Sequence, residues 1–549
     1  MKAAEALVDC LIQEGVDTVF GIPGSKFLET LDAMWFRREE IRFITTRHEQ
    51  GAAFMAMGYA MARGGVGVCY ATLGPGTTNL VTGVADAYKN AVPVLALGGM
   101  MASESLGRDG WQEIDQAAVL RPVTKESVSV PVARNLPLYL RRAFRTATGQ
   151  LPGPVYLGIP MELLAEEIAH EPLARESYRG APCSQVVIPP GPLEEIVERL
   201  RAAKAPVILT GRELRGARMD REILEFAEKL QIPLVTTSEG HGGLPTTHPL
   251  VLGSTGKSGC PVANECLRGA DLILALGVKF DLHGTGFGHA FVPKDAALVH
   301  VSRFAQYIGA NFPVTVGLQA PIGSFLRALA SRIAHSPAPQ RDPSPWTRKL
   351  EAWRKSRGEA TGVLRQARPL KPQWVAAALQ PHAVAGAFFT FDGGNFKKFL
   401  MKGLDLPESG MLFKDDGYGC VGSALPTALG YQAGRPEARV FCITGDMGYL
   451  LNSAELETAV RENLPVVTVI FNDRGLGNIR EYQDRNYAGR HLGVDYTPAD
   501  YAAAARAFGA HGETVTDPDQ VEPAIQRALA SGKPAVLDML VDPTELAPK

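Results

Sequence analysis

The chain has 549 residues, enough for about three domains of ordinary size. Its 56 basic and 58 acidic residues give a formal net charge of −2, so nothing in the charge favours a nucleic acid or an anionic membrane as partner. Seven cysteines without a close C-x-x-C pair argue against a disulfide framework and against a structural zinc site. The amino-terminal segment carries acidic residues early, unlike a signal peptide, and no apolar run approaches the length of a membrane span. We therefore expect a cytoplasmic protein.

The first third combines a short strand with a helix of small residues. Residues 41–46 are apolar and β-branched enough for a strand, and residues 51–62 follow it as a helix. Glu49 lies at the start of that helix, where the helix dipole and free amides favour a carboxylate. A glutamate that only begins a helix explains the local sequence equally well.

Two segments have the composition of linkers. Residues 335–345 are rich in proline, and residues 162–191 end in a Pro-Pro-Gly turn. They divide the chain into 1–165, 190–335 and 360–549, and each part alternates short apolar strands with helical patterns. This alternation predicts an α/β protein of three doubly wound parallel-sheet domains. The first and last parts repeat the same order of strand, turn and helix.

Acidic residues follow two apolar strands of the last third. The strand at 439–444 ends at Gly445-Asp446, and the strand at 466–471 ends at Asn472-Asp473. Asn452-Ser-Ala-Glu455 between them predicts a helix start with a capping box. A unit of this length is normally a crossover between parallel strands, so both acids should lie at the carboxyl edge of one sheet. Oxygen ligands there favour Mg²⁺ or Ca²⁺ carrying a phosphate ester, although loop aspartates without a ligand remain the alternative.

A Gly-Asp pair followed 27 positions later by Asn-Asp resembles the signature of the thiamine-diphosphate enzymes. In that family the first aspartate, the second aspartate and a nearby backbone carbonyl hold Mg²⁺, which corresponds here to Asp446, Asp473 and Gly475. The resemblance assigns to the diphosphate and its metal the following residues: Asp446, Met447, Gly448, Asp473, Gly475, Leu476 and Gly477. The family usually has glycine where this chain has Met447, and a side chain at that position would crowd the diphosphate.

Three motifs in the first third resemble the pyrimidine-binding domain of the same family. Phe20 to Gly24, Arg47 to Glu49 and Gly74 to Asn79 appear in the family's order. The resemblance makes Glu49 the carboxylate that hydrogen-bonds the pyrimidine ring and promotes loss of the thiazolium proton, while Gly24 and Asn79 bind the cofactor. In the family this glutamate meets the metal site of another subunit, so the resemblance implies a homodimer or homotetramer.

Two further segments of the last third resemble cofactor contacts. Within Gly417-Tyr-Gly-Cys-Val-Gly, Gly419 would offer its carbonyl to the amino group of the pyrimidine, and Val421 would separate the two rings. Gly394 and Asn395, in the turn that follows the strand at 387–391, would touch the diphosphate. A Gly-Gly-Asn turn needs no ligand, which is the alternative for this pair.

Over nearly its whole length the chain is most similar to the large subunit of acetolactate synthase and its relatives. Gln112 would orient a substrate carbonyl, and Asn478, Ile479 and Tyr482 would line the acceptor side. The relatives usually have methionine at the position of Asn478 and tryptophan at that of Tyr482, so the substrates are not carried over. Lys26 stands where the relatives have a small or neutral residue. It would meet an anionic substrate group or remain a solvated surface lysine.

The resemblance implies a carboligase that depends on thiamine diphosphate and Mg²⁺. It would decarboxylate a 2-oxo acid and transfer the acyl anion to a second carbonyl. No His-His pair is present, and Thr72-Leu73 precedes Gly74, so no obvious acid would release an aldehyde. The alternatives are a decarboxylase or carbon–carbon lyase on the same scaffold, and a non-catalytic paralogue. We expect no FAD, because the strand at 205–210 leads into Gly-Arg-Glu rather than a glycine-rich turn.

Overall fold

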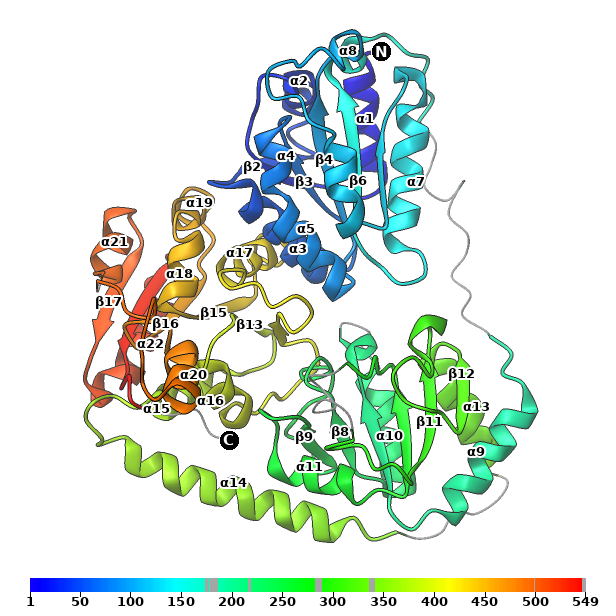
Figure 1. Ribbon diagram of the computed structural model, residues 1–549, viewed down its shortest axis with the longest axis vertical. Coiled ribbons are helices and arrows are strands. Elements are labelled where there is room, and N and C mark those ends of the chain that lie inside the picture. Colours follow the sequence, from blue (N-terminus) through cyan, green and yellow to red (C-terminus); the bar gives the residue numbers. More distant parts are fainter. Residues whose placement is uncertain are drawn as a thin grey trace.

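The computed structural model contains three six-stranded sheets, each flanked by helices (Figure 1). The structure describes residues 1–172, 177, 186–215, 219–281, 289–334, 341–497 and 499–545. Every strand pairing within the three sheets is parallel, which confirms the predicted fold class. Among the described residues, no helix has both the length and the apolar character to cross a membrane.

The first sheet has the order β2-β1-β3-β4-β6-β5. Its strands are β1 (Thr18–Gly21), β2 (Arg42–Thr45), β3 (Gly67–Ala71), β4 (Val94–Met100), β5 (Glu126–Ser129) and β6 (Val155–Pro160). The helices around it are α1 (Ala3–Gln13), α2 (Leu28–Phe36), α3 (Glu49–Arg63), α4 (Pro75–Asn79), α5 (Val81–Asn90), α6 (Gln116–Leu120), α7 (Leu136–Thr148) and α8 (Met161–Ala165). Helices α1 and α7 pack on one face, and α3 and α5 on the other.

The middle sheet has the order β12-β11-β10-β7-β8-β9. Its strands are β7 (Pro206–Thr210), β8 (Leu234–Thr236), β9 (Val251–Ser254), β10 (Leu272–Leu276), β11 (Ala297–Ser302) and β12 (Val316–Gln319). The helices are α9 (Pro190–Ala202), α10 (Asp220–Leu230), α11 (Pro261–Arg268) and α13 (Ile322–Ala334). Its order reverses between β7 and β10, as in nucleotide-binding sheets.

The last sheet has the order β14-β13-β15-β16-β18-β17. Its strands are β13 (Ala387–Phe391), β14 (Leu412–Lys414), β15 (Arg439–Gly445), β16 (Val467–Asn472), β17 (His511–Val515) and β18 (Ala535–Leu540). The helices are α15 (Pro372–Ala378), α16 (Phe396–Gly403), α17 (Ala424–Gly434), α18 (Asp446–Asn452), α19 (Glu455–Arg461), α20 (Gly477–Tyr487), α21 (Tyr501–Ala507) and α22 (Val521–Ala530). Counted within its own domain, each strand takes the same place as in the first sheet, which confirms the predicted similarity of the two parts.

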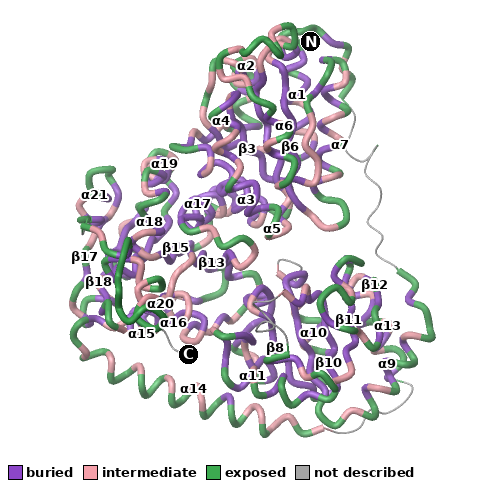
Figure 2. The backbone as a smooth tube through the Cα atoms, in the orientation of Figure 1, coloured by how far each residue is buried: buried purple, intermediate pink, exposed green. Residues whose placement is uncertain are grey.

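Helices α3 and α17 join the first and last domains at the centre of the molecule (Figure 1). One apolar cluster runs through both domains at this contact, and Figure 2 shows the two helices as almost entirely buried. A Cβ on Gly430 would lie 1.9 Å from the carbonyl oxygen of Met55, and a Cβ on Gly58 would lie 2.1 Å from that of Thr427. Only glycine allows the two backbones to approach so closely, which explains the small residues of both helices.

The helix predicted between the two strands is present as α19, but its predicted cap at Asn452 is wrong. Helix α18 begins at Asp446 itself, directly after β15, and a second helix, α19, begins at Glu455. The Glu455 carboxylate does not close a capping box. It accepts hydrogen bonds from the backbone amides of Arg47 and His48, at 3.0 and 3.1 Å. A contact between two domains has therefore replaced the local cap.

The two predicted linkers lie partly outside the described residues, which exclude 173–176, 178–185 and 335–340. In the described part of the linker at 335–345, the long helix α14 (Ser344–Leu364) begins at Ser344. Leu350 of that helix is buried against the middle domain, with Trp346 and Trp353 packed beside it. Proline at the second helical position suits a helix start, because its missing N–H is not needed there.

Candidate functional site

The two sequence-predicted acids meet at the carboxyl edge of the last sheet. Strands β15 and β16 are parallel neighbours, so Asp446 after the first and Asp473 after the second lie side by side. Both side chains are buried. The Gly475 amide donates to Asp446 Oδ2 at 3.1 Å, and Asn395 Nδ2 lies 3.4 Å from Asp473 Oδ2.

Burial perturbs the ionisation of both acids of this pair. Burial, and after it the charge of the neighbouring Asp446, raise the pKa of Asp473 to about 6. Burial also raises the pKa of Asp446. Arg480 pairs at 2.6 Å with Asp495, and its charge also offsets part of the rise in the pKa of Asp473. Two buried carboxylates that oppose each other's ionisation fit a divalent cation, since hard oxygen donors are what Mg²⁺ binds.

Glycines bring the backbone close to Asp473 and to Asp392, a third buried acid that follows strand β13. A Cβ on Gly477, the first residue of α20, would lie 1.8 Å from Asp473 Oδ2. A Cβ on Gly448, in the first turn of α18, would lie 2.5 Å from Asp392 Oδ2. Met447 is half-buried, and its amide donates to Asp446 Oδ1 at 2.8 Å. Leu476 precedes α20, with its amide bonded to the Val494 carbonyl at 2.8 Å.

The loop after β14 leads to the same edge of the sheet. Asp392, buried at the end of β13, accepts the Gly422 amide at 2.9 Å on both carboxylate oxygens. Burial raises the pKa of Asp392 to about 6. Val421 is partly exposed and packs near Gly393, where a Cβ would lie 3.3 Å from Val421 Cγ2. Gly419 is exposed and has a φ of +82°, a conformation that favours glycine. Sequence reasoning missed the role of Asp392, although an acid at a strand end could have suggested it.

The polar residues predicted for the first domain also come together. Glu49 is the first residue of α3 and is 7 % exposed. Asn79 Nδ2 donates to Glu49 Oε2 at 2.9 Å. A Cβ on Gly74 would lie 2.6 Å from the Gln112 carbonyl oxygen, and a Cβ on Gly76 would lie 3.2 Å from Glu49 Oε1. Asn79 therefore contacts Glu49 directly, and Gln112 lies against the Gly74 end of the same turn.

Two other sequence-predicted residues follow the first strand. Gly24 fits closely against Thr72, since a Cβ would lie 2.2 Å from its Cβ. Lys26 is half-buried two residues later. Glu49 begins α3 of the first domain, whereas Asp446 and Asp473 follow strands of the last sheet.

Helix α20 carries the residues predicted to line the acceptor side. Asn478, Ile479 and Tyr482 are exposed, and Glu481 is the buried residue of the helix. Their helix begins next to the acid pair, because Gly477 contacts Asp473. The helix thus presents these side chains beside the candidate metal position.

In the middle domain, the backbone packs closely at the point where the strand order reverses. A Cβ on Gly211, after β7, would lie 2.2 Å from the carbonyl oxygen of Gly277, after β10. Glu213 is buried beside this turn, and its carboxylate accepts the Arg303 amide at 3.1 Å and the Ser302 hydroxyl. Burial raises the pKa of Glu213. The Arg303 guanidinium lies 3.7 Å from the Glu213 carboxylate, so this crevice holds a paired charge beside closely packed backbone.

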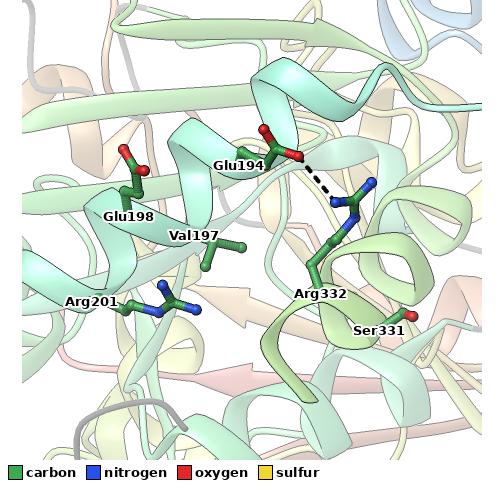
Figure 3. Close-up of a pocket in the computed structure, with 6 residues that line it drawn as sticks. All are labelled: Glu194, Val197, Glu198, Arg201, Ser331 and Arg332. Carbon is green, nitrogen blue, oxygen red and sulfur yellow. Dashed lines mark hydrogen bonds and ion pairs between the residues drawn. The ribbon is translucent and has the colours of Figure 1, made fainter. Parts of the chain in front are cut away.

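A groove of about 470 Å³ lies on the outer side of the middle domain, between α9 and α13 (Figure 3). Glu194 and Arg332 form an ion pair across it at 3.1 Å. The two sequence-predicted sites lie in the other two domains, so this groove belongs to neither of them.

The fold and the two polar sites define an α/β protein of three parallel-sheet domains, with buried acids at the carboxyl edge of the last sheet. Three family models match the chain: thiamine pyrophosphate enzyme, N-terminal TPP binding domain over residues 1–119; central domain over 193–329; and C-terminal TPP binding domain over 392–539. The chain belongs to the thiamine pyrophosphate enzyme family.

Its curated relatives include large subunits of acetolactate synthase. The isozyme 3 large subunit of Escherichia coli is 32 % identical, over 99 % of this chain and 96 % of that protein. The large subunit of Corynebacterium glutamicum is 33 % identical, over 98 % of this chain and 87 % of that protein. The large subunit of Haemophilus influenzae is 31 % identical, over 99 % of this chain and 95 % of that protein. These matches confirm the resemblance predicted from the motifs.

Proposed function

We propose that this chain is a carboligase that depends on thiamine diphosphate and Mg²⁺. It decarboxylates a 2-oxo acid and joins the acyl group to a second carbonyl compound. The observation that carries the proposal is the similarity to acetolactate synthase large subunits over nearly the full length of both proteins. Bound thiamine diphosphate supplies a carbon nucleophile and accepts the electrons released when CO₂ leaves.

Asp446 and Asp473 hold the magnesium ion in this proposal, with the carbonyl of Gly475 as a third ligand. The raised pKa of Asp473, caused by burial and by Asp446, supports a cation at this position. Residues Gly394, Asn395, Met447, Gly448, Leu476 and Gly477 line the diphosphate. The contact of Gly477 with Asp473 supports this assignment, because only a glycine leaves room there.

The loop from Gly417 to Gly422 holds the aminopyrimidine and the bend between the two rings. Gly419 offers its carbonyl and Val421 its side chain. The exposure of both residues supports this role, as does the pair of hydrogen bonds from the Gly422 amide to Asp392, which fixes the loop to the sheet.

Glu49 is the acid–base residue of the first domain in this proposal, and Gly24 and Asn79 complete the pyrimidine site. Its carboxylate hydrogen-bonds the ring nitrogen and so governs the protonation of the amino group opposite. Asn79 orients the carboxylate, which its 2.9 Å hydrogen bond supports. A buried carboxylate held by one amide keeps an oxygen free for the ring.

A second copy of the chain brings Glu49 to the acid pair in this proposal, giving a homodimer or a homotetramer. Large apolar side chains exposed on both domains support an interface. In the first domain these are Leu28, Trp35, Phe36, Leu106 and Trp111, and in the last domain Leu450, Leu451, Ile479 and Tyr482.

The substrates bind between Gln112 and α20. Gln112 orients the keto carbonyl, Lys26 meets the carboxylate of the acid, and Asn478, Ile479 and Tyr482 line the acceptor side. We further propose that the protein is cytoplasmic, that its domains span 1–165, 190–335 and 360–549, and that it functions without FAD. The close approach of Gly211 to the Gly277 carbonyl at the middle switch point supports the last of these.

The test is turnover of the purified protein with thiamine diphosphate, Mg²⁺ and a panel of 2-oxo acids, with and without aldehyde acceptors. CO₂ and organic products are followed together. CO₂ matched by ligated product supports the carboligase and identifies its donor. CO₂ with free aldehyde would instead identify a decarboxylase on the same scaffold.

A further inference from the structure

Two buried carboxyl groups face each other where the first domain meets the loop from Gly417 to Gly422. Asp86 lies on α5, and Asp415 follows β14. Their side chains are 0 % and 3 % exposed. One ligand-type atom each of Asp86, Asp415 and Cys420 lies within 4.8 Å of the others. Asn90 Nδ2 bridges the two acids, at 2.6 Å from Asp86 Oδ1 and 3.0 Å from Asp415 Oδ1.

Asp415 accepts hydrogen bonds from the loop that follows it. The amides of Gly417 and Tyr418 donate to its Oδ1, at 3.1 and 2.9 Å, and the Cys420 amide donates to its Oδ2. Together with Asn90, these are four donors on one side chain. An ionised carboxylate has about four acceptor positions, so this set of partners fits the charged form. Oδ1 receives three of these donors, and the carboxylate also accepts hydrogen bonds from the Gly419 amide and from Asp86.

Asp86 has the opposite surroundings. Its Oδ2 is buried and has no donor among the described residues. Two ionised carboxylates at this separation in a buried position repel each other. A proton on Asp86 removes the second charge and gives Oδ2 a partner at the same time. Burial raises the pKa of Asp86 well above its usual range, and the adjacent Asp415 adds to the effect. Burial also acts to raise the pKa of Asp415, but the hydrogen bonds from Asp86 and the loop amides lower it overall.

We propose that Asp86 and Asp415 share one proton, carried on Asp86, and that this pair positions the loop from Gly417 to Gly422. The pair ties the loop to α5 of the first domain, as the bonds from Gly422 to Asp392 tie its far end to the sheet. Asp86 and Asp415 are positioning residues. The consequence for the cofactor rests on the proposed role of Gly419 and Val421.

The two acids consequently respond differently to the same substitution. Asparagine at position 86 reproduces the protonated acid, because its amide donates to Asp415 while its carbonyl accepts from Asn90. Asparagine at position 415 has one acceptor oxygen where the loop needs two, and its amide opposes a backbone N–H. Asp86→Asn is therefore tolerated, whereas Asp415→Asn releases the loop.

The pair also makes stability depend on pH. The charged or titratable groups that face it are Cys420 in the loop, Asp392 after β13, Arg215 after β7 and Lys397 on α16. Burial keeps Cys420 a neutral thiol by raising its pKa. The pKa of Asp86 is higher in the folded chain than in the unfolded chain, so its contribution is present in acid and is lost as the pH rises. Asp86→Asn removes that loss.

The first experiment uses the full chain without cofactor. Infrared difference spectra between wild type and Asp86→Asn should show a protonated carboxyl band in the wild type, with exposed Asp32→Asn as the control that shows none. The thermal midpoint of Asp86→Asn should rise relative to that of the wild type as the pH increases above about 4, the pKa of aspartate in an unfolded chain. Absence of the band, or equal pH profiles, would overturn the shared proton. A metal bound in the wild type and lost in Asp86→Asn would also overturn it.

The second experiment titrates each variant with thiamine diphosphate and Mg²⁺ and follows intrinsic fluorescence. Asp415→Asn should weaken binding at least about 10-fold, the loss expected when a buried charged hydrogen-bond group is altered, while Asp86→Asn stays within about 3-fold. Equal weakening by both variants would overturn the asymmetry. If the infrared band is present and Asp415→Asn binds normally, the proposed role of the loop in cofactor binding fails, and the shared proton stands.

Discussion

The contact between α3 and α17 predicts opposite effects for the same substitution at two helical glycines. Gly430 lies in α17 and Gly358 lies in α14. A Cβ on Gly430 would lie 1.9 Å from the Met55 carbonyl oxygen, about 1.5 Å short of an ordinary contact of 3.4 Å. A Cβ on Gly358 would meet nothing within 4 Å. Both residues become alanine, so the helix propensity gained is the same.

Alanine stabilises a helix interior by about 1 kcal/mol relative to glycine. Overpacking of a closely packed contact costs about 1–3 kcal/mol, because neither backbone can yield without moving its helix. Gly358→Ala should therefore raise stability by up to about 1 kcal/mol, which is the propensity gain alone. Gly430→Ala should lower it by up to about 2 kcal/mol, the overpacking cost less that gain.

Thermal unfolding of the two variants, followed by calorimetry and far-ultraviolet circular dichroism, measures both effects. Because α3 begins at Glu49, a shift of α3 should also weaken thiamine diphosphate binding in Gly430→Ala and leave it unchanged in Gly358→Ala. A Gly430→Ala protein as stable as Gly358→Ala, with wild-type cofactor affinity, would refute the close helix contact.

Three further substitutions test the acid pair, the glycine beside it, and the contact between the first and last domains. The pKa of Asp473 is raised to about 6 in the fold by burial and by Asp446, so its contribution favours acid and is lost as the pH rises through about 6. In EDTA, the thermal midpoint of Asp473→Asn should depend less on pH than that of the wild type. Added Mg²⁺ and cofactor should stabilise the variant less than they stabilise the wild type. An unchanged pH profile would contradict the acid pair. Gly477→Ala should lower metal-dependent cofactor affinity at least about 10-fold, because its Cβ would lie 1.8 Å from Asp473 Oδ2, while Gly65→Ala, with nothing within 4 Å, binds as the wild type does. Glu455→Gln should destabilise the protein by about 1–3 kcal/mol in chemical denaturation, since its buried carboxylate holds two amides of the first domain; wild-type stability would contradict that role.

The strand ends were predictable from the sequence because their signal is local. Apolar runs placed β15 and β16, and parallel pairing then brought Asp446 and Asp473 to one edge. Glu49 was predictable as a helix start, and α3 does begin there. The similarity of the first and last domains also followed from the order of strand and helix patterns.

What the sequence could not predict depends on contacts between domains. Glu455 reads as part of a capping box, but its carboxylate finds stronger partners in the amides of Arg47 and His48. Asp415 reads as a loop acid, and only the fold brings it to Asp86. The start of helix α14 was not predicted, because the prolines around it indicated a linker. Trp346 and Leu350 stabilise this helix by packing on the middle domain. Tertiary contacts outweigh local preferences at these positions.

Turnover of Glu49→Gln under saturating thiamine diphosphate and Mg²⁺ tests the proposed chemistry most directly. CO₂ and ligated product are measured with the donor that the wild type accepts, and cofactor binding is measured in parallel. Loss of the carboxylate should reduce turnover by about 10²–10⁴-fold, the range for an acid–base group, while the fold remains intact. Full turnover by Glu49→Gln would contradict the assignment of Glu49 and, with it, the proposed cofactor site.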